Sequence, residues 1–142
     1  MDIVYSYLTK EYRGNKVETI NNYLTRPIYC TQDTRIAEVR YLLKKYENDE
    51  ILVLDSAEEG HPVGMIKFSD TEIAPHDEHL PYDESAQELM TELSTVVRPD
   101  TSVEVCLDIM REKKLDSIVV VNESGQLRGV VKKQDIIHRI LH

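Results

Sequence analysis

The stretch Asp100-Thr101-Ser102-Val103 decides the fold, because the similar stretch Asp33-Thr34-Arg35-Ile36 precedes it by 67 residues. Apolar residues agree at the same offset: Val39 matches Cys106, Leu42 matches Ile109, and Leu43 matches Met110. Self-similarity at a fixed spacing is typical of a duplicated structural unit. The chain is therefore expected to contain two related copies.

The match continues along the chain. At the offset of 67, Asp49, Ile51 and Val53 match Asp116, Ile118 and Val120. Farther on, an offset of 65 aligns Gly64, Lys67 and Asp70 with Gly129, Lys132 and Asp135. The two-residue difference falls in a turn-rich loop, where a change in length costs little free energy.

Each copy predicts a helix after its Asp-Thr pair. Thr101 followed by Glu104 predicts a capping box, in which the two side chains bind free backbone N–H groups of the first turn. Apolar residues at helical spacing predict one buried stripe per helix. The stripe contains Ile36, Val39, Leu43 and Tyr46 in the first copy, and Val103, Cys106, Leu107 and Met110 in the second.

Strands are expected on either side of this helix. Short extended segments, at residues 28–30 and 95–97, precede it. Continuous apolar runs at residues 51–54 and 118–121 have the length of a strand and predict strands buried on both faces. A third strand and a last helix complete each copy, the helix being short at residues 69–74 and longer at 134–141. The order β-α-β-β-α, present twice, predicts a mixed α/β (α+β) fold.

The repeats suggest four segments. These are an N-terminal extension with a helical lead-in (1–19), a first repeat (20–74), a polar, proline-bounded linker (75–84) and a second repeat (85–142). A repeat of about 60 residues buries little surface alone, so the two repeats are expected to share a core. A helical lead-in at Ser85–Met90 is expected before the second repeat, and a matching one within residues 1–24 before the first.

The composition excludes several classes of partner. The chain of 142 residues has a net charge of −9, which repels nucleic acids and anionic lipids. No apolar run is long enough for a membrane helix and the N-terminus lacks the pattern of a signal peptide, so a cytoplasmic protein is expected. Cys30 and Cys106 lack the spacing of a metal site or a disulfide framework and are expected to be reduced.

The order of elements and several local motifs resemble the CBS domain, named after cystathionine β-synthase. The second copy carries the pattern most clearly, in Met90-Thr91, Thr95–Thr101, Ile118–Asn122 and Gly129–Asp135. The first copy matches through Thr25–Ile28, Asp33-Thr34, Ile51–Asp55 and Gly64–Asp70. The resemblance covers residues 20 to 141.

The resemblance implies a tandem pair of CBS repeats, known as a Bateman module, packed sheet to sheet with pseudo-twofold symmetry. Such pairs often form homodimers. They commonly bind AMP, ADP, ATP, S-adenosylmethionine or cyclic di-AMP as regulatory ligands in clefts between the repeats. The resemblance therefore implies a regulatory module that requires no cofactor.

The resemblance also implies particular ligand-binding residues. The aspartate at the positions of Asp70 and Asp135 accepts hydrogen bonds from ribose hydroxyls in the family, a role that suits a carboxylate at a helix start. The residues that open the first two strands would flank the base. The candidate residues are Ile28, Glu50, Ile51, Lys67 and Asp70 in the first copy, and Thr95, Ser117, Ile118, Lys132 and Asp135 in the second.

Two departures from the family pattern affect this site. Lys67 and Lys132 stand where the family usually has Ser or Thr. A lysine either binds phosphate as a point charge or pairs with its own aspartate and closes an empty cleft. Asp49 and Glu50 add negative charge to the first site, so the second is expected to bind better.

Structural explanations compete with these functional ones. Asp70 and Asp135 would serve equally well as helix N-caps, and lysines at strand ends are commonly solvated. Metal-ligand residue types occur at His76, Asp77, Glu78 and His79, but adjacent residues in a linker rarely converge on one ion, so no metal site is predicted. The remaining histidines, His61, His138 and His142, are assigned no role. Tyr5, Tyr7, Tyr12 and Tyr23 form either a partner-binding surface or the packed face of the lead-in.

Three functions follow in order of preference. A nucleotide-sensing module that signals to a partner protein comes first. A degenerate pair that serves as a dimerisation or protein-interaction scaffold, without nucleotide binding, is the alternative. Enzyme activity comes last, because the sequence contains no Gly-x-Ser-x-Gly elbow, Walker loop or His-Glu-x-x-His motif, and no catalytic residue is predicted.

Overall fold

The computed structural model describes residues 18–72 and 83–141. Within these ranges the chain forms two compact units. Unit 1 combines residues 18–26 with residues 95–141, and unit 2 contains the described part of residues 27–94. Each unit is a sheet with helices packed against it, as the β-α-β-β-α pattern predicts.

Unit 2 is built on a four-stranded sheet in the order β1-β2-β3-β4. Strand β1 (Tyr29–Thr31) runs parallel to β2 (Glu50–Leu54), which pairs antiparallel with β3 (Pro62–Lys67). Strand β4 (Thr91–Glu92) adds to the far edge of β3. Helix α2 (Ile36–Lys45) connects β1 to β2, the 3-10 helix η2 (Phe68–Thr71) follows β3, and the short helix α3 (Ala86–Leu89) precedes β4.

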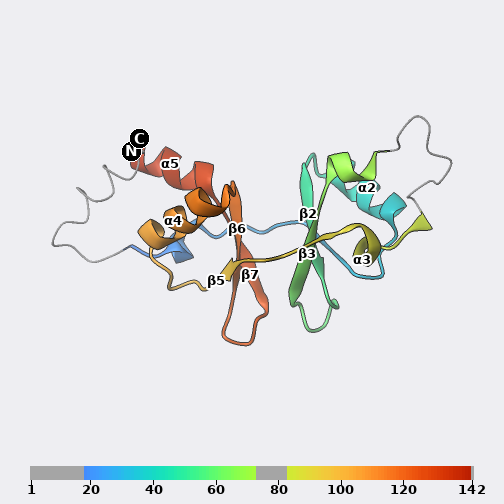
Figure 1. The fold of residues 1–142 in the computed structure, drawn as a ribbon, viewed down its shortest axis with the longest axis horizontal. Coiled ribbons are helices and arrows are strands. Elements are labelled where there is room, and N and C mark those ends of the chain that lie inside the picture. Colours follow the sequence, from blue (N-terminus) through green and yellow to red (C-terminus); the bar gives the residue numbers. More distant parts are fainter. Residues whose placement is uncertain (1–17, 73–82, 142) are drawn as a thin grey trace. The chain divides into compact units, whose positions relative to one another are not determined.

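Unit 1 repeats this plan with a three-stranded sheet in the order β5-β6-β7. Strand β5 (Val96–Val97) is parallel to β6 (Ser117–Val121), and β7 (Leu127–Lys132) is antiparallel to it. Helix α4 (Val103–Lys113) connects β5 to β6, and α5 (Lys133–Leu141) follows β7 directly. Figure 1 shows α4 and α5 on the same side of this sheet. The 3-10 helix η1 (Ile20–Tyr23) completes the unit.

The predicted apolar stripes form the two cores. All four predicted stripe residues of α4 are buried, and so are Ile36, Val39 and Leu43 of α2. The strands β2 and β6 are buried from their second to their last residue, as a strand covered on both faces should be. Tyr46 was predicted as part of the stripe but is 52% exposed, because α2 ends at Lys45 and the backbone leaves helical geometry there.

The predicted capping box is wrong by one residue. The N-cap of α4 is Ser102, whose hydroxyl accepts a hydrogen bond from the Val105 N–H at 3.1 Å. Thr101 instead accepts a hydrogen bond from the Arg98 N–H, which closes the turn before the helix. Thr34 does the same for Thr31 in unit 2. The hydroxyl of each Asp-Thr pair therefore stabilises the turn that precedes the helix and does not cap it.

The lead-in segments pack on opposite repeats. Thr25 and Val130 of β7 exchange two backbone hydrogen bonds of 2.9 and 3.0 Å, and the Thr25 hydroxyl donates a third to the Val130 carbonyl. Arg139 of α5 lies over the Tyr23 ring. In unit 2, the Ala86 N–H donates to the Thr34 carbonyl at 2.7 Å. The compact units and the sequence repeats therefore do not coincide at the lead-ins.

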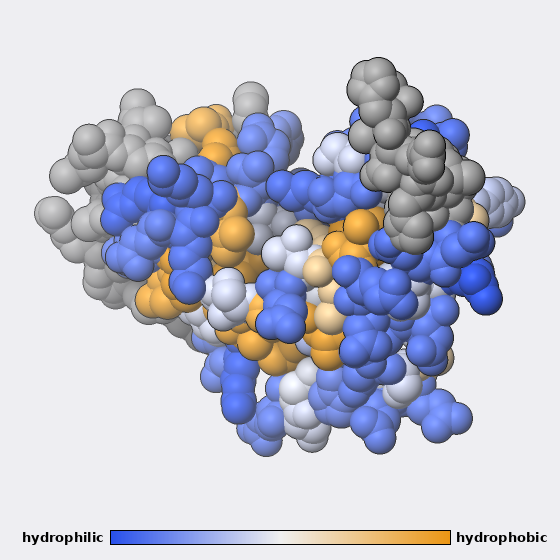
Figure 2. Space-filling view, turned by 45° about the vertical axis from the view of Figure 1, so that its right-hand side comes forward, coloured by the Kyte–Doolittle hydropathy of each residue, from blue (hydrophilic) through white to orange (hydrophobic). Residues whose placement is uncertain are grey.

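Several expectations concern segments that the structure does not describe. The N-terminal extension with Tyr5, Tyr7 and Tyr12, most of the linker with His76 and His79, and His142 lie outside the described residues. Among the described residues, no helix has the length and apolar character needed to cross a bilayer. The face drawn in Figure 2 is mostly hydrophilic, with apolar residues showing in patches between the charged ones.

Candidate functional site

The five candidate residues of the second copy meet at one end of the unit 1 sheet. Ser117 opens β6 and is the cross-strand partner of Lys132, which ends β7. Ile118 follows Ser117, and Thr95 directly precedes β5, which is parallel to β6 and begins at the same end. Asp135 lies in the first turn of α5, which continues from β7. The local fold thus brings together residues that lie up to 40 positions apart.

Two charged groups at this end of the sheet are exposed and make no contact of hydrogen-bond or ion-pair type with the described residues. Within residues 18–72 and 83–141, neither the Lys132 ammonium nor the Asp135 carboxylate makes a hydrogen bond or an ion pair. The N-terminus of the nine-residue helix α5 adds backbone N–H groups and the positive end of its dipole. This arrangement can accept hydrogen bonds from hydroxyl groups at Asp135 and attract an anion at Lys132.

Thr95 contributes an unusual feature to the same end. Its hydroxyl oxygen is buried and has no hydrogen-bond partner among the described residues. A buried hydroxyl without a partner costs about 1–3 kcal/mol. Native structures seldom leave such a group unsatisfied unless a water molecule, an ion or a ligand pairs with it.

The candidate residues of the first copy take matching positions in unit 2. Glu50 opens β2 and is the cross-strand partner of Lys67 at the end of β3, with Ile51 following Glu50. The Ile28 carbonyl, just before β1, accepts the Leu52 N–H at 3.2 Å. The structure therefore also gathers these residues at one end of the sheet.

Asp70 differs from its counterpart Asp135 in one respect. Its carboxylate accepts a hydrogen bond from the backbone N–H of Lys67 at 3.0 Å and so closes the first turn of η2. Neighbouring contacts hold this turn in place, because Arg40 donates to the carbonyl and hydroxyl of Thr71 and stacks 4.7 Å from the centroid of the Phe68 ring. Asp70 thus has a structural role at the start of η2, but it is not the N-cap that the sequence suggested, because Lys67 takes that position.

The charges near the two sheet ends also differ. Unit 1 has two lysines, Lys132 and Lys133, against two aspartates, Asp116 and Asp135. Unit 2 has one lysine, Lys67, against three carboxylates: Asp49, Glu50 and Asp70. An anionic ligand is therefore repelled less in unit 1, in line with the preference drawn from the sequence.

The cysteines are buried groups of the two cores. Burial raises the pKa of the Cys106 thiol to about 11. Burial also raises the pKa of Cys30 to about 11, and the Glu38 carboxylate raises it by a smaller amount. A hydrogen bond with Thr34 acts in the opposite direction and lowers it. Both thiols stay protonated near neutral pH and lack the thiolate that nucleophilic chemistry needs.

The duplicated β-α-β-β-α units, with matched polar residues at the same end of each sheet, define a tandem-repeat module of the mixed α/β class. Residues 86–142 match the family model of the CBS domain. The chain has the fold of a tandem CBS pair, because solved structures of CBS-pair proteins have the same fold.

Solved structures of two such proteins illustrate the similarity. CBSX2 from Arabidopsis thaliana is 20% identical, with a TM-score of 0.73 over 89% of this chain and 96% of that one. A structure of CBSX2 in complex with AMP has a TM-score of 0.74. The CBS domain pair of protein MJ0100, in complex with 5'-methylthioadenosine and S-adenosyl-L-methionine, is 21% identical, with a TM-score of 0.69 over 89% of this chain and 97% of that one.

Curated relatives are longer proteins. Inosine-5'-monophosphate dehydrogenase from Aquifex aeolicus is 24% identical over 143 aligned positions, which cover 96% of this chain. The chain spans only 28% of the length of that dehydrogenase. The similarity therefore concerns a minor part of the enzyme.

Proposed function

We propose that the chain is a regulatory module that binds an adenosine-containing ligand and catalyses no reaction. The binding position is the end of the unit 1 sheet that carries Lys132 and Asp135. The observation that supports it most strongly is the exposed Asp135 carboxylate, which no other described side chain or backbone group engages. Complexes of similar CBS pairs with AMP and with S-adenosyl-L-methionine support the class of ligand.

The chemistry of the residues fits the parts of such a ligand. The Asp135 carboxylate can accept both hydroxyls of a ribose. Lys132 and the N-terminus of α5 can attract a phosphate or another anionic group. The Thr95 hydroxyl, buried and without a described partner, can hydrogen-bond to a heteroatom of the base.

A ligand regulates only if it binds two states of the protein with different affinity. We propose that the module transmits such a difference to a partner protein in the cytoplasm, and that it acts as a homodimer. The bound nucleotide would then shift an equilibrium between two conformations, which the partner senses.

The first experiment is a thermal melt of the purified chain against AMP, ADP, ATP, S-adenosylmethionine, NAD and cyclic di-AMP. A ligand at 100 times its Kd stabilises the folded state by about 2.7 kcal/mol, which raises the Tm by several degrees. Asp135→Asn keeps the size of the side chain but removes its charge, and should abolish the shift. Asp70→Asn is the matched control and should retain it. An equal shift in the Asp135→Asn variant would refute the assignment.

A scaffold without nucleotide binding is the second candidate. It is favoured by the structural role of Asp70 and by two exposed tyrosines: Tyr41 within α2, which is 57% accessible, and Tyr46 directly after α2, which is 52% accessible. Exposed tyrosines are common in protein interfaces. This function predicts that no ligand of the panel changes the Tm of the folded protein. It also predicts that the protein sediments as a dimer, and that substitution of Tyr41 dissociates the dimer.

A further inference from the structure

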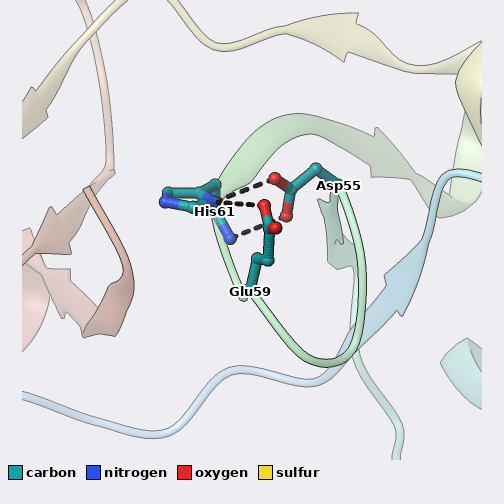
Figure 3. A group of neighbouring side chains, drawn as sticks. All are labelled: Asp55, Glu59 and His61. Atoms are coloured by element: carbon teal, nitrogen blue, oxygen red, sulfur yellow. Dashed lines mark hydrogen bonds and ion pairs between the residues drawn. The ribbon is translucent and has the colours of Figure 1, made fainter. Parts of the chain in front are cut away.

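The loop between β2 and β3 brings together three side chains of metal-ligand type. The Nδ1 atom of His61 lies 2.9 Å from Oδ2 of Asp55 and 3.7 Å from Oε2 of Glu59. One donor atom from each residue lies within 4.8 Å of the other two. Figure 3 shows the two carboxylates directed toward the same edge of the imidazole ring.

The Asp55 carboxylate is held in place by the backbone of its own loop. Its Oδ1 atom accepts hydrogen bonds from the N–H groups of Ser56, at 2.7 Å, and His61, at 2.9 Å. These bonds leave Oδ2 directed toward the imidazole. Outer hydrogen bonds of this kind orient the carboxylate ligands of metal sites.

The matching loop of unit 1 serves as an internal comparison. Asn122 there takes the place of Asp55, and its Oδ1 accepts the N–H groups of Ser124 and Gln126, both at 2.9 Å. The Asn122 amide also donates to the Gln126 side chain at 3.2 Å, as Asp55 contacts His61. Neutral amides are therefore sufficient to close such a loop. Loop closure does not explain why unit 2 uses ionisable groups or why a second carboxylate, Glu59, faces the same nitrogen.

We propose that Asp55, Glu59 and His61 form a binding site for a divalent first-row transition ion, with Zn²⁺ as the probe. Tetrahedral zinc with bonds of about 2.1 Å separates its ligand atoms by roughly 3.4 Å, which lies within the range of the distances in this group. Glu59 is the most exposed of the three side chains, at 70%, and can adjust its position. Three protein ligands leave one tetrahedral position that water or a ligand can take.

The donor set selects the class of ion. An imidazole nitrogen favours zinc, nickel, copper or iron over magnesium and calcium, which prefer oxygen ligands. In the bound state the ion replaces the hydrogen between His61 and Asp55. His61 has no role in the sequence-based prediction, which contains no metal site, because the three residues follow no metal-binding motif and meet only when the loop closes.

The test is isothermal titration of Zn²⁺ into the full chain and two variants. The double variant Asp55→Asn/His61→Gln reproduces in unit 2 the amide pair that closes the unit 1 loop, so it should keep the loop folded and lose the ion. Glu59→Gln changes an exposed side chain and should weaken binding at least tenfold. Thiols and the linker histidines contribute the same background to all three proteins.

The expected result is one Zn²⁺ equivalent in the wild-type protein that is absent from the double variant, which remains folded at the temperature of the titration. Equal stoichiometry and affinity in the double variant would overturn the proposal. So would an unchanged affinity in Glu59→Gln, or wild-type binding weaker than about 1 mM, which would indicate adventitious association only. Ca²⁺ in place of Zn²⁺ should bind more weakly by at least tenfold.

Discussion

Replacing Gly129 with alanine should loosen the segment around Thr25 from strand β7. A Cβ atom at Gly129 would lie 2.8 Å from the Thr25 carbonyl oxygen, which pairs with Val130 through backbone hydrogen bonds. The obstructing atom belongs to the backbone, so relief requires a shift of the whole segment. Gly64 is the matched position in unit 2, where the new Cβ would meet the side chain of Met90, including its Cγ at 2.8 Å.

The two substitutions should therefore differ in cost. Overpacking at Gly129 costs about 1–3 kcal/mol, and a weakened pair of backbone hydrogen bonds adds about 1 kcal/mol. Reduced entropy of the unfolded chain offsets about 0.4–1 kcal/mol in both variants. At Gly64 the flexible methionine can move aside, so the net cost should be about 1 kcal/mol or less. We expect Gly129→Ala to be less stable than Gly64→Ala by roughly 1–2 kcal/mol.

Urea denaturation measures this difference, and amide hydrogen exchange locates it. Exchange at Thr25 and Val130 should accelerate at least tenfold in Gly129→Ala and remain unchanged in Gly64→Ala. Equal stabilities, together with wild-type protection of the Thr25 amide in Gly129→Ala, would refute the close packing of the lead-in against β7.

Three further predictions concern single groups. The pKa of Asp55 is lower in the folded state than in the unfolded chain, because its hydrogen bonds outweigh its desolvation. The ionised carboxylate therefore stabilises the fold above the unfolded pKa, and this contribution is lost as the pH falls through the folded pKa. Between pH 6 and 2.5, the urea midpoint should fall less steeply in Asp55→Asn than in the wild-type protein. The thiols of Cys30 and Cys106, each with a pKa of about 11, should react with iodoacetamide at pH 8 at least 100-fold more slowly in the folded protein than in urea, and equal rates would contradict their burial. Ser102→Ala should cost about 1 kcal/mol in urea denaturation because it removes the side-chain hydrogen bond at the N-cap of α4, and an unchanged urea midpoint would contradict this cap.

The sequence predicted the elements of both units well because the signals are local. The apolar run at 118–121 and the stripe containing Cys106 and Met110 determine which residues a strand or a helix buries, and both were confirmed. The fold of a tandem CBS pair was likewise confirmed. The predictions for Tyr46 and for the capping box were wrong. Both concern helix ends, where a shift of one residue decides whether a side chain packs in the core or caps the helix.

Features that depend on long-range contacts were harder to predict. Nothing in the local pattern around Thr25 indicates a bridge to Val130, which lies 105 residues away. The different environments of Asp70 and Asp135 were also not predictable, because both have the same place in the repeat. In unit 2 the Asp70 carboxylate folds back onto the Lys67 N–H, and no matching hydrogen bond from Lys132 to Asp135 forms among the described residues of unit 1. The roles of the ten candidate residues remain predictions.

The most direct test of the proposed function is an NMR titration of the ¹⁵N-labelled chain with AMP. Ligand binding at the end of the unit 1 sheet predicts that amide shifts cluster at Thr95, Ser117 and Lys132–Asp135, saturate with concentration and disappear in Asp135→Asn. Shifts confined to other residues, or no shift with AMP and the rest of the ligand panel, would contradict it.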